Sequence, residues 1–537
     1  MTRGERRPGA APTACLILLA GAASAPAAPA EPVRTSAGLL EGLRGDSGVR
    51  AFLGVPYAVP PVGELRWRAP GPAPAWEGVR SAKDFGPRCM QQRIYDDMIF
   101  RDERSEDCLY LNVWTPAAGA EDLPVMVWIH GGGFQAGSAS EPRQDGARLA
   151  EQGVVVVGLN YRLGVFGFLV HPELTAEPPE GASGNYGLHD MVAALRWVRG
   201  EIAAFGGDPE NVTIFGESAG SFAVSALMAS PLARGLFHRA IGQSGAFFRA
   251  DDPAAASRAE AEGQGRRFAE SLGAASLAEL RALPAEKVLE AAPARGELRF
   301  WPVVDGEVLP EPVREVFAAG RQSPVPLLAG WNEDEVRGGV VLGPDRPDAE
   351  AFRARVRERY GEDAGAVLAA YPAGSDAEAL ESAAALAGDE FIAYATWKWI
   401  ETHAGTGGAP VYRYRFDRDV PLAPGTQWAG VEATREDVGA RHAGEIEYVF
   451  GALDSLPEVA WEPRDEELSQ LLRAYWSSFA ADGDPNAEGL PAWPRYAGDG
   501  GHAVMHLGDT AEARGDAHRH RYLALDAIAT ERLQAEP

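Results

Sequence analysis

Four short segments consist almost entirely of apolar residues, and they constrain the fold more than any other feature of the chain. They are Val125–Ile129, Val154–Leu159, Val212–Phe215 and Val325–Leu328. A strand with one face in water alternates apolar and polar residues, whereas these runs do not, so both of their faces must be covered. Helical patterns such as Leu188–Ala204 separate them. The sequence therefore predicts an α/β fold with a mostly parallel central sheet flanked by helices.

Two further stretches are rich in Ala, Glu and Arg and carry helical patterns. They cover about residues 254–292 and 345–403. In open α/β sheets, insertions at the carboxyl ends of strands lie over the active-site crevice. We expect one domain over residues 31–537, in which these helical insertions either lie over an active site or form a packed structural layer.

The amino terminus has the pattern of an export signal. Arginines within the first seven residues precede an apolar stretch from Ala10 to Ala25, and Ala28 and Ala30 supply small residues for cleavage before Glu31. Residues 1–30 are therefore predicted to be a cleavable signal peptide, with earlier Ala pairs as alternative cleavage sites. The mature protein is expected to be secreted or periplasmic. No later segment has the roughly 20 apolar residues of a spanning helix, so stable membrane insertion is not expected.

Removal of this leader would also remove Cys15, one of the 3 cysteines. The remaining pair, Cys89 and Cys108, is predicted to form a disulfide, because disulfides persist in oxidising compartments. In the chain-entropy model, such a loop contributes roughly 3 kcal/mol to stability. The alternative is a pair of buried thiols.

The net charge argues against one class of partner. The chain has 50 Lys and Arg against 77 Asp and Glu, which gives a formal charge of −27 at pH 7. Nucleic-acid binding depends on clustered Lys and Arg, so DNA and RNA are not expected partners. The oligomeric state is left open by the composition.

A Gly-x-Ser-x-Gly pattern occupies residues 216–220, where a strand-like run ends and a helical pattern of small residues begins. In this context a sharp strand-to-helix turn exposes the serine hydroxyl, and flanking glycines avoid clashes with neighbouring backbone. Ser218 is therefore the candidate nucleophile. The alternative is a serine in an ordinary Gly-rich turn.

A second Gly-rich segment, His130–Phe134, directly follows the apolar run that ends at Ile129. Backbone N–H groups without neighbouring side chains can point at an oxygen that gains negative charge during acyl transfer. The predicted donors of this oxyanion hole are Gly132, Gly133 and Ala219. From their proximity to the motifs, the predicted substrate-pocket residues are Phe134, Phe222 and Trp331.

A serine nucleophile needs a base, and in folds with this elbow an acid and then a histidine follow it along the chain. In the segment that follows the fourth apolar run, Glu335 is the first candidate acid and Asp334 the second, and spacing does not separate them. His442 is the favoured base, because it lies in a Gly-rich loop before an apolar segment. The other downstream histidines are His403, His502, His506, His518 and His520.

Taken together, these residues resemble the type-B carboxylesterase family of the α/β hydrolases, which also contains the cholinesterases. The segment Phe205–Gly220 is similar to the family's active-site serine signature, and Glu106–Val113 is similar to its second signature. The similarity runs from about Val33 to Trp493. One departure is that the segment Met90–Asp107 contains no Trp, whereas cholinesterases carry their choline-binding Trp there. A dedicated choline esterase is therefore not expected.

The resemblance implies the α/β-hydrolase fold and hydrolysis of carboxylic esters through an acyl-enzyme, with no metal or organic cofactor. It implies Glu335 as the acid, His442 as the base and a bridge between Cys89 and Cys108. The alternative activities are hydrolysis of a specialised bulky ester, polyester, carbamate or amide. The alternative of another class is a non-catalytic adhesion or scaffold protein on the same fold.

Overall fold

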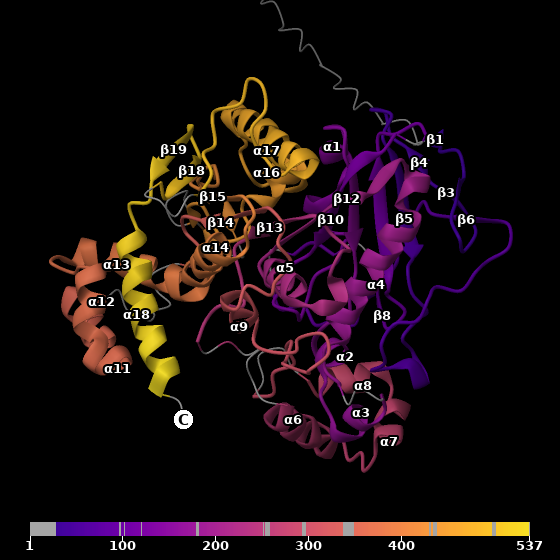
Figure 1. The fold of residues 1–537 in the computed structure, drawn as a ribbon, viewed down its shortest axis with the longest axis horizontal. Coiled ribbons are helices and arrows are strands. Elements are labelled where there is room, and N and C mark those ends of the chain that lie inside the picture. Colours follow the sequence, from indigo (N-terminus) through magenta and orange to yellow (C-terminus); the bar gives the residue numbers. More distant parts are fainter. Residues whose placement is uncertain are drawn as a thin grey trace, which may run out of the picture.

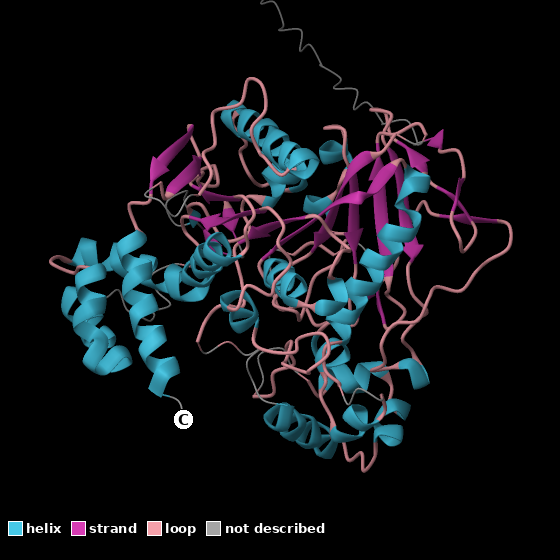
Figure 2. Ribbon diagram, in the orientation of Figure 1, coloured by secondary structure: helices cyan, strands magenta, loops and turns pink. Residues whose placement is uncertain are grey.

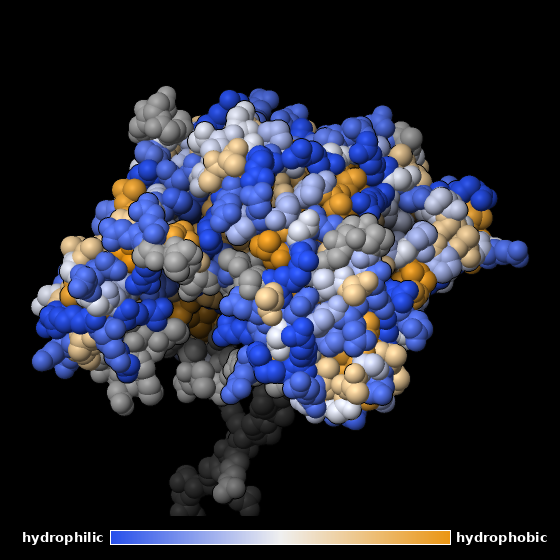
Figure 3. All heavy atoms as spheres, turned by 60° about the horizontal axis from the view of Figure 1, so that its bottom comes forward, coloured by the Kyte–Doolittle hydropathy of each residue, from blue (hydrophilic) through white to orange (hydrophobic). Residues whose placement is uncertain are grey.

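The computed structural model describes residues 28–95, 98–100, 103–119, 121–178, 182–250, 252, 258–292, 297–336, 348–428, 431–432, 438–496 and 501–535. Of the predicted signal peptide, residues 1–27 lie outside this part of the chain. Over the described ranges, no helix is both long enough and apolar enough to cross a membrane. The face shown in Figure 3 is mostly hydrophilic, with small and separate apolar patches.

Twelve strands of the described residues form one sheet, which runs through the centre of the molecule (Figure 1). In spatial order they are β1 (Ala28–Pro29), β4 (Leu43–Arg44), β5 (Arg50–Pro56), β9 (Tyr110–Thr115), β11 (Val155–Leu159), β10 (Leu123–Ile129), β12 (Gly207–Glu217), β13 (Arg239–Gln243), β14 (Leu327–Asn332), β15 (Val411–Phe416), β18 (Ala503–Leu507) and β19 (Ala511–Gly515). Neighbours from β11 to β18 are parallel, and the outer pairs are antiparallel. The predicted mostly parallel sheet is confirmed.

Shorter strands form separate ladders. They are β2 (Val33–Arg34), β3 (Leu39–Glu41) and β6 (Val79–Ser81) in one, β7 (Arg88–Cys89) and β8 (Arg104–Ser105) in another, and β16 (Gln427–Trp428) and β17 (Val431–Glu432) in a third.

The helices lie on both sides of the central sheet (Figure 2). They are α1 (Ala147–Ala150), α2 (Gly164–Phe168), α3 (Pro172–Ala176), α4 (Tyr186–Glu201), α5 (Ala219–Ala229), α6 (Arg258–Ser271), α7 (Leu277–Ala282), α8 (Ala285–Glu290), α9 (Val313–Ala318), α11 (Ala349–Tyr360), α12 (Ala364–Ala370), α13 (Asp376–Gly388), α14 (Tyr394–Thr406), α16 (Ile446–Phe450), α17 (Pro463–Asp482) and α18 (Arg519–Ala535). A π-helical segment, Asp389–Ala393, joins α13 to α14.

Strand β10 shows why its sequence is apolar at every position. Val127 and Ile129 face one hydrophobic core, which also contains residues of α4 and α5. Met126 and Trp128 face a second core, on the side of α16 and α17. Successive side chains of a strand point to opposite faces, so a strand between two helical layers buries all of them.

The fourth apolar run was predicted two residues too early. The strand there, β14, begins at Leu327 rather than at Val325. Pro326 lies between these positions, and it has no N–H to donate to a neighbouring strand. The first donor of the strand is the N–H of Leu327, which binds the carbonyl of Pro410.

The segments predicted to be helical insertions contain two groups of helices. Helices α6, α7 and α8 lie within residues 254–292, and α11, α12, α13 and most of α14 lie within 345–403. Figure 1 shows the first group at the bottom of the view, and α11 to α13 beside α18 at the left. Residues 253–257 and 345–347 lie outside the described part of the chain.

Candidate active site

Ser218 occupies a tight turn between β12 and α5. Its backbone has φ 53° and ψ −121°, a left-handed conformation that non-glycine residues rarely adopt. A Cβ at Gly216 would lie 2.6 Å from the carbonyl carbon of Gly220, and a Cβ at Gly220 would lie 1.9 Å from the carbonyl oxygen of Ile129. Both flanking positions therefore require glycine, as expected for a strand-to-helix elbow that presents a nucleophile.

Glu335 and His442 are far apart in sequence but lie in contact. Glu335 follows β14, His442 precedes α16, and Glu335 Oε2 lies 2.5 Å from His442 Nδ1. The other carboxylate oxygen, Oε1, accepts hydrogen bonds from the backbone N–H of Asn332 at 2.7 Å and from the hydroxyl of Ser244 at 2.6 Å. Because both oxygens are engaged, the carboxylate is held in one orientation toward the imidazole.

Asp334, the second candidate acid, has a different position. Its Oδ2 accepts a hydrogen bond from the backbone N–H of Ala440 at 3.0 Å. Asp334 also pairs with Arg441 through a backbone bridge. Asp334 therefore anchors the segment that carries His442, whereas Glu335 contacts the ring.

The opposite side of the His442 ring reaches the elbow. Nε2 lies 3.1 Å from Oε1 of Glu217, the neighbour of Ser218. Within the described residues, no hydrogen bond joins the Ser218 hydroxyl to the His442 ring. The structure thus holds the imidazole between Glu335 on Nδ1 and Glu217, the residue before Ser218, on Nε2.

The two carboxyl groups around His442 alter its proton affinity. Burial by itself lowers the pKa of His442, but the charges of Glu217 and Glu335 outweigh burial and raise this pKa to about 9. Burial raises the pKa of the Glu217 carboxyl to about 8, although the nearby imidazole acts in the opposite direction. The Glu217–His442 pair therefore retains protons at a higher pH than either group does in water.

A third buried carboxyl group, that of Glu445, lies near Glu335. Its Oε2 accepts from the Asn332 amide at 2.6 Å, and its Oε1 accepts from the Gln243 amide at 3.1 Å. Burial, followed by the charge of Glu335, raises the pKa of Glu445. Gln243 in turn accepts from the indole of Trp476 at 3.1 Å. This network ties strands β13 and β14 to the loop that carries His442.

The predicted oxyanion donors have peptide planes with defined directions. In a trans peptide, the C=O of one residue and the N–H of the next point in opposite directions. The Gly131 carbonyl is 2.9 Å from Nδ1 of His130, and the Gly132 carbonyl accepts from the backbone N–H groups of Gln135 and Ala136, each at 3.0 Å. The N–H groups of Gly132 and Gly133 therefore point away from these contacts. Ala219 begins α5, so its N–H has no acceptor within the helix.

Phe134 and Phe222 belong to one aromatic cluster. Phe247 stacks on Phe134 at a centroid distance of 6.1 Å and lies edge-on to Phe222 at 5.0 Å. Trp301 joins the cluster at 5.5 Å from Phe134. A Cβ at Gly245 would touch Phe222 at 2.6 Å and the Ser218 carbonyl at 2.9 Å, so the cluster borders the elbow. Phe247 and Trp301 were not predicted, because they come from segments distant in sequence.

Trp331 lies in a different environment from the one we expected. Its ring lies 4.4 Å from the Arg413 guanidinium and 5.5 Å from the Tyr522 ring. Trp331 belongs to β14, so alternation along the strand, and not its closeness in sequence to Glu335, sets its direction. Nothing in these contacts joins Trp331 to the cluster of Phe134 and Phe222.

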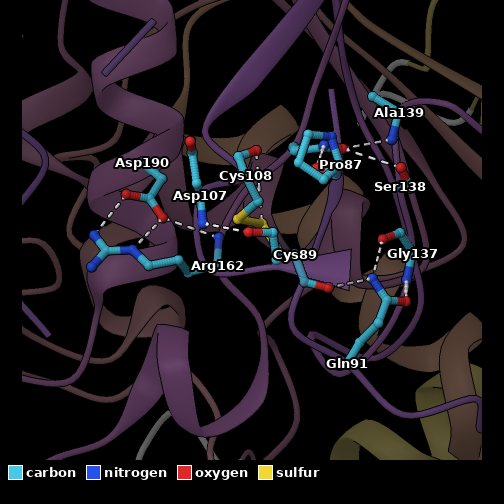
Figure 4. Close-up of a disulfide and its surroundings, with 12 residues drawn as sticks. Pro87, Cys89, Gln91, Asp107, Cys108, Gly137, Ser138, Ala139, Arg162 and Asp190 are labelled. Atoms are coloured by element: carbon cyan, nitrogen blue, oxygen red, sulfur yellow. Dashed lines mark hydrogen bonds and ion pairs between the residues drawn. A yellow bond between two sulfur atoms is a disulfide. The ribbon is translucent and has the colours of Figure 1, made fainter. Parts of the chain in front are cut away.

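Cys89 and Cys108 form the predicted disulfide, with an S–S distance of 2.06 Å (Figure 4). Both cysteines are buried. Over the described ranges, no group of three or more His, Cys, Asp or Glu side chains is arranged to hold a metal ion.

The mostly parallel sheet, with a serine elbow between β12 and α5, defines an α/β hydrolase. A family model described as the carboxylesterase family matches residues 29–524. The chain therefore belongs to the carboxylesterase family, and it is a hydrolase of ester bonds.

Two characterised relatives and one solved structure illustrate this similarity. The chain is 38% identical to fumonisin B1 esterase of Sphingopyxis macrogoltabida, over 86% of this chain and 84% of that protein. It is 38% identical to para-nitrobenzyl esterase of Bacillus subtilis (strain 168), over 86% of this chain and 92% of that protein. The structure of a Geobacillus stearothermophilus carboxylesterase superposes with a TM-score of 0.79 at 35% identity, over 92% of this chain and 99% of the other.

Proposed function

We propose that this esterase uses Ser218 as nucleophile, His442 as general base and Glu335 as the acid that orients the base. The contact of 2.5 Å between Glu335 Oε2 and His442 Nδ1 carries this proposal. It fixes the imidazole so that Nε2, which lies 3.1 Å from Glu217 Oε1, is on the side of the elbow. A histidine oriented by a carboxylate can activate a serine hydroxyl.

In the proposed reaction, Nε2 of His442 takes the proton of Ser218 as the hydroxyl oxygen attacks the ester carbonyl. The protonated imidazole then gives this proton to the leaving alcohol, and an acyl-enzyme remains. Water, deprotonated by the same histidine, attacks the acyl-enzyme and releases the acid. Nε2 must turn from Glu217 toward Ser218 for the first step, and hydrogen bonds in substrate-free sites often tighten only when substrate binds.

We propose that the N–H groups of Gly132, Gly133 and Ala219 stabilise the negative oxygen of the tetrahedral intermediates. The directions of the two glycine N–H groups, away from the bonded carbonyls of Gly131 and Gly132, support this role. The removal of one such donor typically lowers kcat by about 100- to 1,000-fold.

The proposed substrate is a carboxylic ester with an apolar group that packs against the aromatic cluster of Phe134, Phe222, Phe247 and Trp301. Aromatic walls bind apolar groups by burial and add no charge requirement. The second candidate is a specialised hydrolase of a bulky ester, polyester, carbamate or amide. The similarity to a fumonisin B1 esterase favours keeping this candidate, because that relative is named for one particular ester.

We further propose that the protein is exported and loses its leader. The disulfide supports this proposal, because such bonds are rare in reducing compartments. Strand β1 pairs Ala28 with Arg44 and Pro29 with Leu43. A cut before Glu31 would remove this edge strand, whereas a cut before Ala28 would keep it. The amino-terminal mass of the protein recovered from an exporting host tests both the cleavage and its position.

A fluorophosphonate probe tests the proposed nucleophile directly. The wild-type protein should react with one probe per chain, and Ser218→Ala should neither react nor hydrolyse a p-nitrophenyl ester. The loss in kcat should be on the order of a million-fold, as for other triads. The melting curve of Ser218→Ala should match that of the wild type. Turnover by Ser218→Ala, or labelling at another serine, would refute the assignment.

A further inference from the structure

Gln91 belongs to none of the sequence motifs described above, but its side chain hydrogen-bonds to the segment that follows the proposed oxyanion hole. Its side-chain Nε2 donates to the carbonyl of Gly137 at 2.8 Å, and its Oε1 accepts from the N–H of the same residue at 2.9 Å (Figure 4). The residue is only 2% exposed. A primary amide that binds both polar groups of one residue fixes the orientation of that residue.

Gly137 has little freedom to compensate for the loss of this contact. It has φ +119°, and a Cβ at this position would lie 2.3 Å from Nδ1 of His130. Buried backbone N–H and C=O groups need partners. Without the Gln91 amide, Gly137 would have to turn toward other partners and take its neighbour Ala136 with it.

The connection from Gly137 to the oxyanion loop is short. The N–H of Ala136 binds the carbonyl of Gly132 at 3.0 Å, and this bond helps to set the plane of the peptide between Gly132 and Gly133. The same plane directs the N–H of Gly133, a proposed oxyanion donor. A rotation of the backbone at Gly137 would therefore change the direction of the Gly133 N–H through the single hydrogen bond between Ala136 and Gly132.

Gln91 also lies close to the disulfide. Gln91 is two residues from Cys89, and its Nε2 also donates to the carbonyl of Cys89 at 3.0 Å. Other residues of the segment closed by the disulfide lie over the same glycines. A Cβ at Gly132 would lie 2.8 Å from Met98 Cε, and one at Gly133 would lie 3.0 Å from the hydroxyl oxygen of Tyr95.

We propose that Gln91 is a positioning residue that, anchored by the Cys89–Cys108 bridge, sets the direction of the Gly133 N–H for transition-state stabilisation. This inference rests on the proposed oxyanion hole. An interaction realised in the transition state changes kcat more than KM. Loss of the Gln91 amide should therefore slow turnover without a comparable change in KM.

The chain provides a matched control in the adjacent residue. Gln92 donates to the carbonyl of Leu289 in α8 at 3.0 Å, so it anchors the same segment to a different part of the molecule. Replacement of either glutamine by Met keeps the length of the side chain and removes its hydrogen bonds. Both changes affect the anchoring of the segment, but only Gln91→Met breaks the link to Gly137.

The test compares kcat, KM and melting temperature of wild type, Gln91→Met and Gln92→Met, with active sites counted by fluorophosphonate titration. Gln91→Met should lose at least about ten-fold in kcat per titrated site, with KM within about two-fold, while Gln92→Met keeps the wild-type kcat. Equal kcat values for the two variants would overturn the inference. A wild-type protein that does not react with the probe would instead refute the proposed nucleophile.

A second measurement avoids any dependence on the folding of Gln91→Met. The wild-type enzyme is assayed with its disulfide intact and after reduction, at a temperature where circular dichroism shows both forms folded. The reduced form should have a lower kcat, and Gln91→Asn, whose shorter amide cannot span both groups of Gly137, should lower kcat in the oxidised form. An unchanged kcat in both cases would overturn the inference.

Discussion

Nε2 of His442 lies 3.1 Å from Oε1 of Glu217, while Nδ1 of the same ring contacts Glu335. The imidazole is therefore placed between two carboxyl groups, one on each nitrogen. Each negative charge favours the protonated ring, and the pKa of His442 is raised to about 9. A general base acts in its neutral form, so this arrangement should shift the acid limb of the activity profile to higher pH.

Glu217→Gln should move that acid limb to lower pH. The substitution keeps the shape of the side chain and removes the charge that raises the pKa of His442, so the neutral imidazole persists to a lower pH. The profile of kcat/KM against pH measures the effect in the free enzyme. Glu210→Gln is the control, because Glu210 is a surface residue 67% exposed in its side chain. An identical shift in both variants would contradict this role of Glu217.

The same pair predicts a pH dependence of stability. In the folded protein the pKa of His442 is raised from 6.5 to about 9 and that of Glu217 from 4.5 to about 8. The folded state then binds more protons than the unfolded chain, so the free energy of unfolding falls as pH rises. This stabilisation is complete below the unfolded pKa values and is lost as pH passes about 8 to 9.

Glu217→Gln should therefore show a smaller fall in melting temperature than the wild type between about pH 7 and 9.5. Differential scanning calorimetry across this range measures the difference. Parallel curves for the two proteins would show that the Glu217–His442 pair does not hold the additional protons.

The aromatic cluster should control which esters are accepted. Trp301→Ala removes a wall of the cluster, so it should raise kcat/KM for esters with bulky acyl or alcohol groups relative to small ones. In an apolar pocket, one methylene more or less on the substrate changes the free energy of discrimination by about 1–3 kcal/mol, which is about 10- to 200-fold in kcat/KM. A panel of p-nitrophenyl and alkyl esters of increasing size measures the ratio.

Trp331→Phe is the comparison for this test. Trp331 packs on Arg413 and Tyr522 and not on the cluster, so its replacement should change stability and leave the substrate ratios unchanged. If Trp331→Phe changed the preference between bulky and small esters and Trp301→Ala did not, Trp331 would line the substrate pocket, as the sequence predicted.

The disulfide should make a measurable contribution to stability. The Cys89–Cys108 bridge spans 19 residues, and cross-linking a loop of this size reduces the entropy of the unfolded chain. The double variant Cys89→Ala, Cys108→Ala should lose about 3 kcal/mol in the free energy of unfolding. Urea unfolding of the wild type with its bridge intact and of the double variant measures this loss. Equal unfolding midpoints for the two proteins would show that the bridge does not stabilise the fold.

The sequence alone predicted the central part of the fold, because parallel strands buried on both faces leave an unbroken apolar run. The antiparallel strands at the edges were not predicted. Strands β4 and β19, for example, carry mostly intermediate or exposed residues, and they give no comparable apolar pattern.

The candidate site was predicted where a local pattern carries the chemistry. Ser218 was found from its flanking glycines, and His442 and Glu335 from their order along the chain and the family resemblance. The sequence could not place the contact between Glu217 and His442 or the bond from Ser244 to Glu335, because these residues meet only after the strands assemble. Trp331 was assigned to the pocket from proximity in sequence, which does not fix the direction of a strand side chain.

The close approach of Gly220 to the carbonyl of Ile129 ties the end of β12 to the end of β10. The segments that carry the proposed nucleophile and the proposed oxyanion donors therefore meet at a glycine where a larger side chain has no room. Helices α6–α8 and α11–α13 bury one face but also have exposed positions, such as Leu380, which is 46% exposed. Directed evolution toward a new ester should therefore conserve the glycines around Ser218. It should instead change exposed side chains of these outer helices, where a new side chain need not displace the reacting atoms.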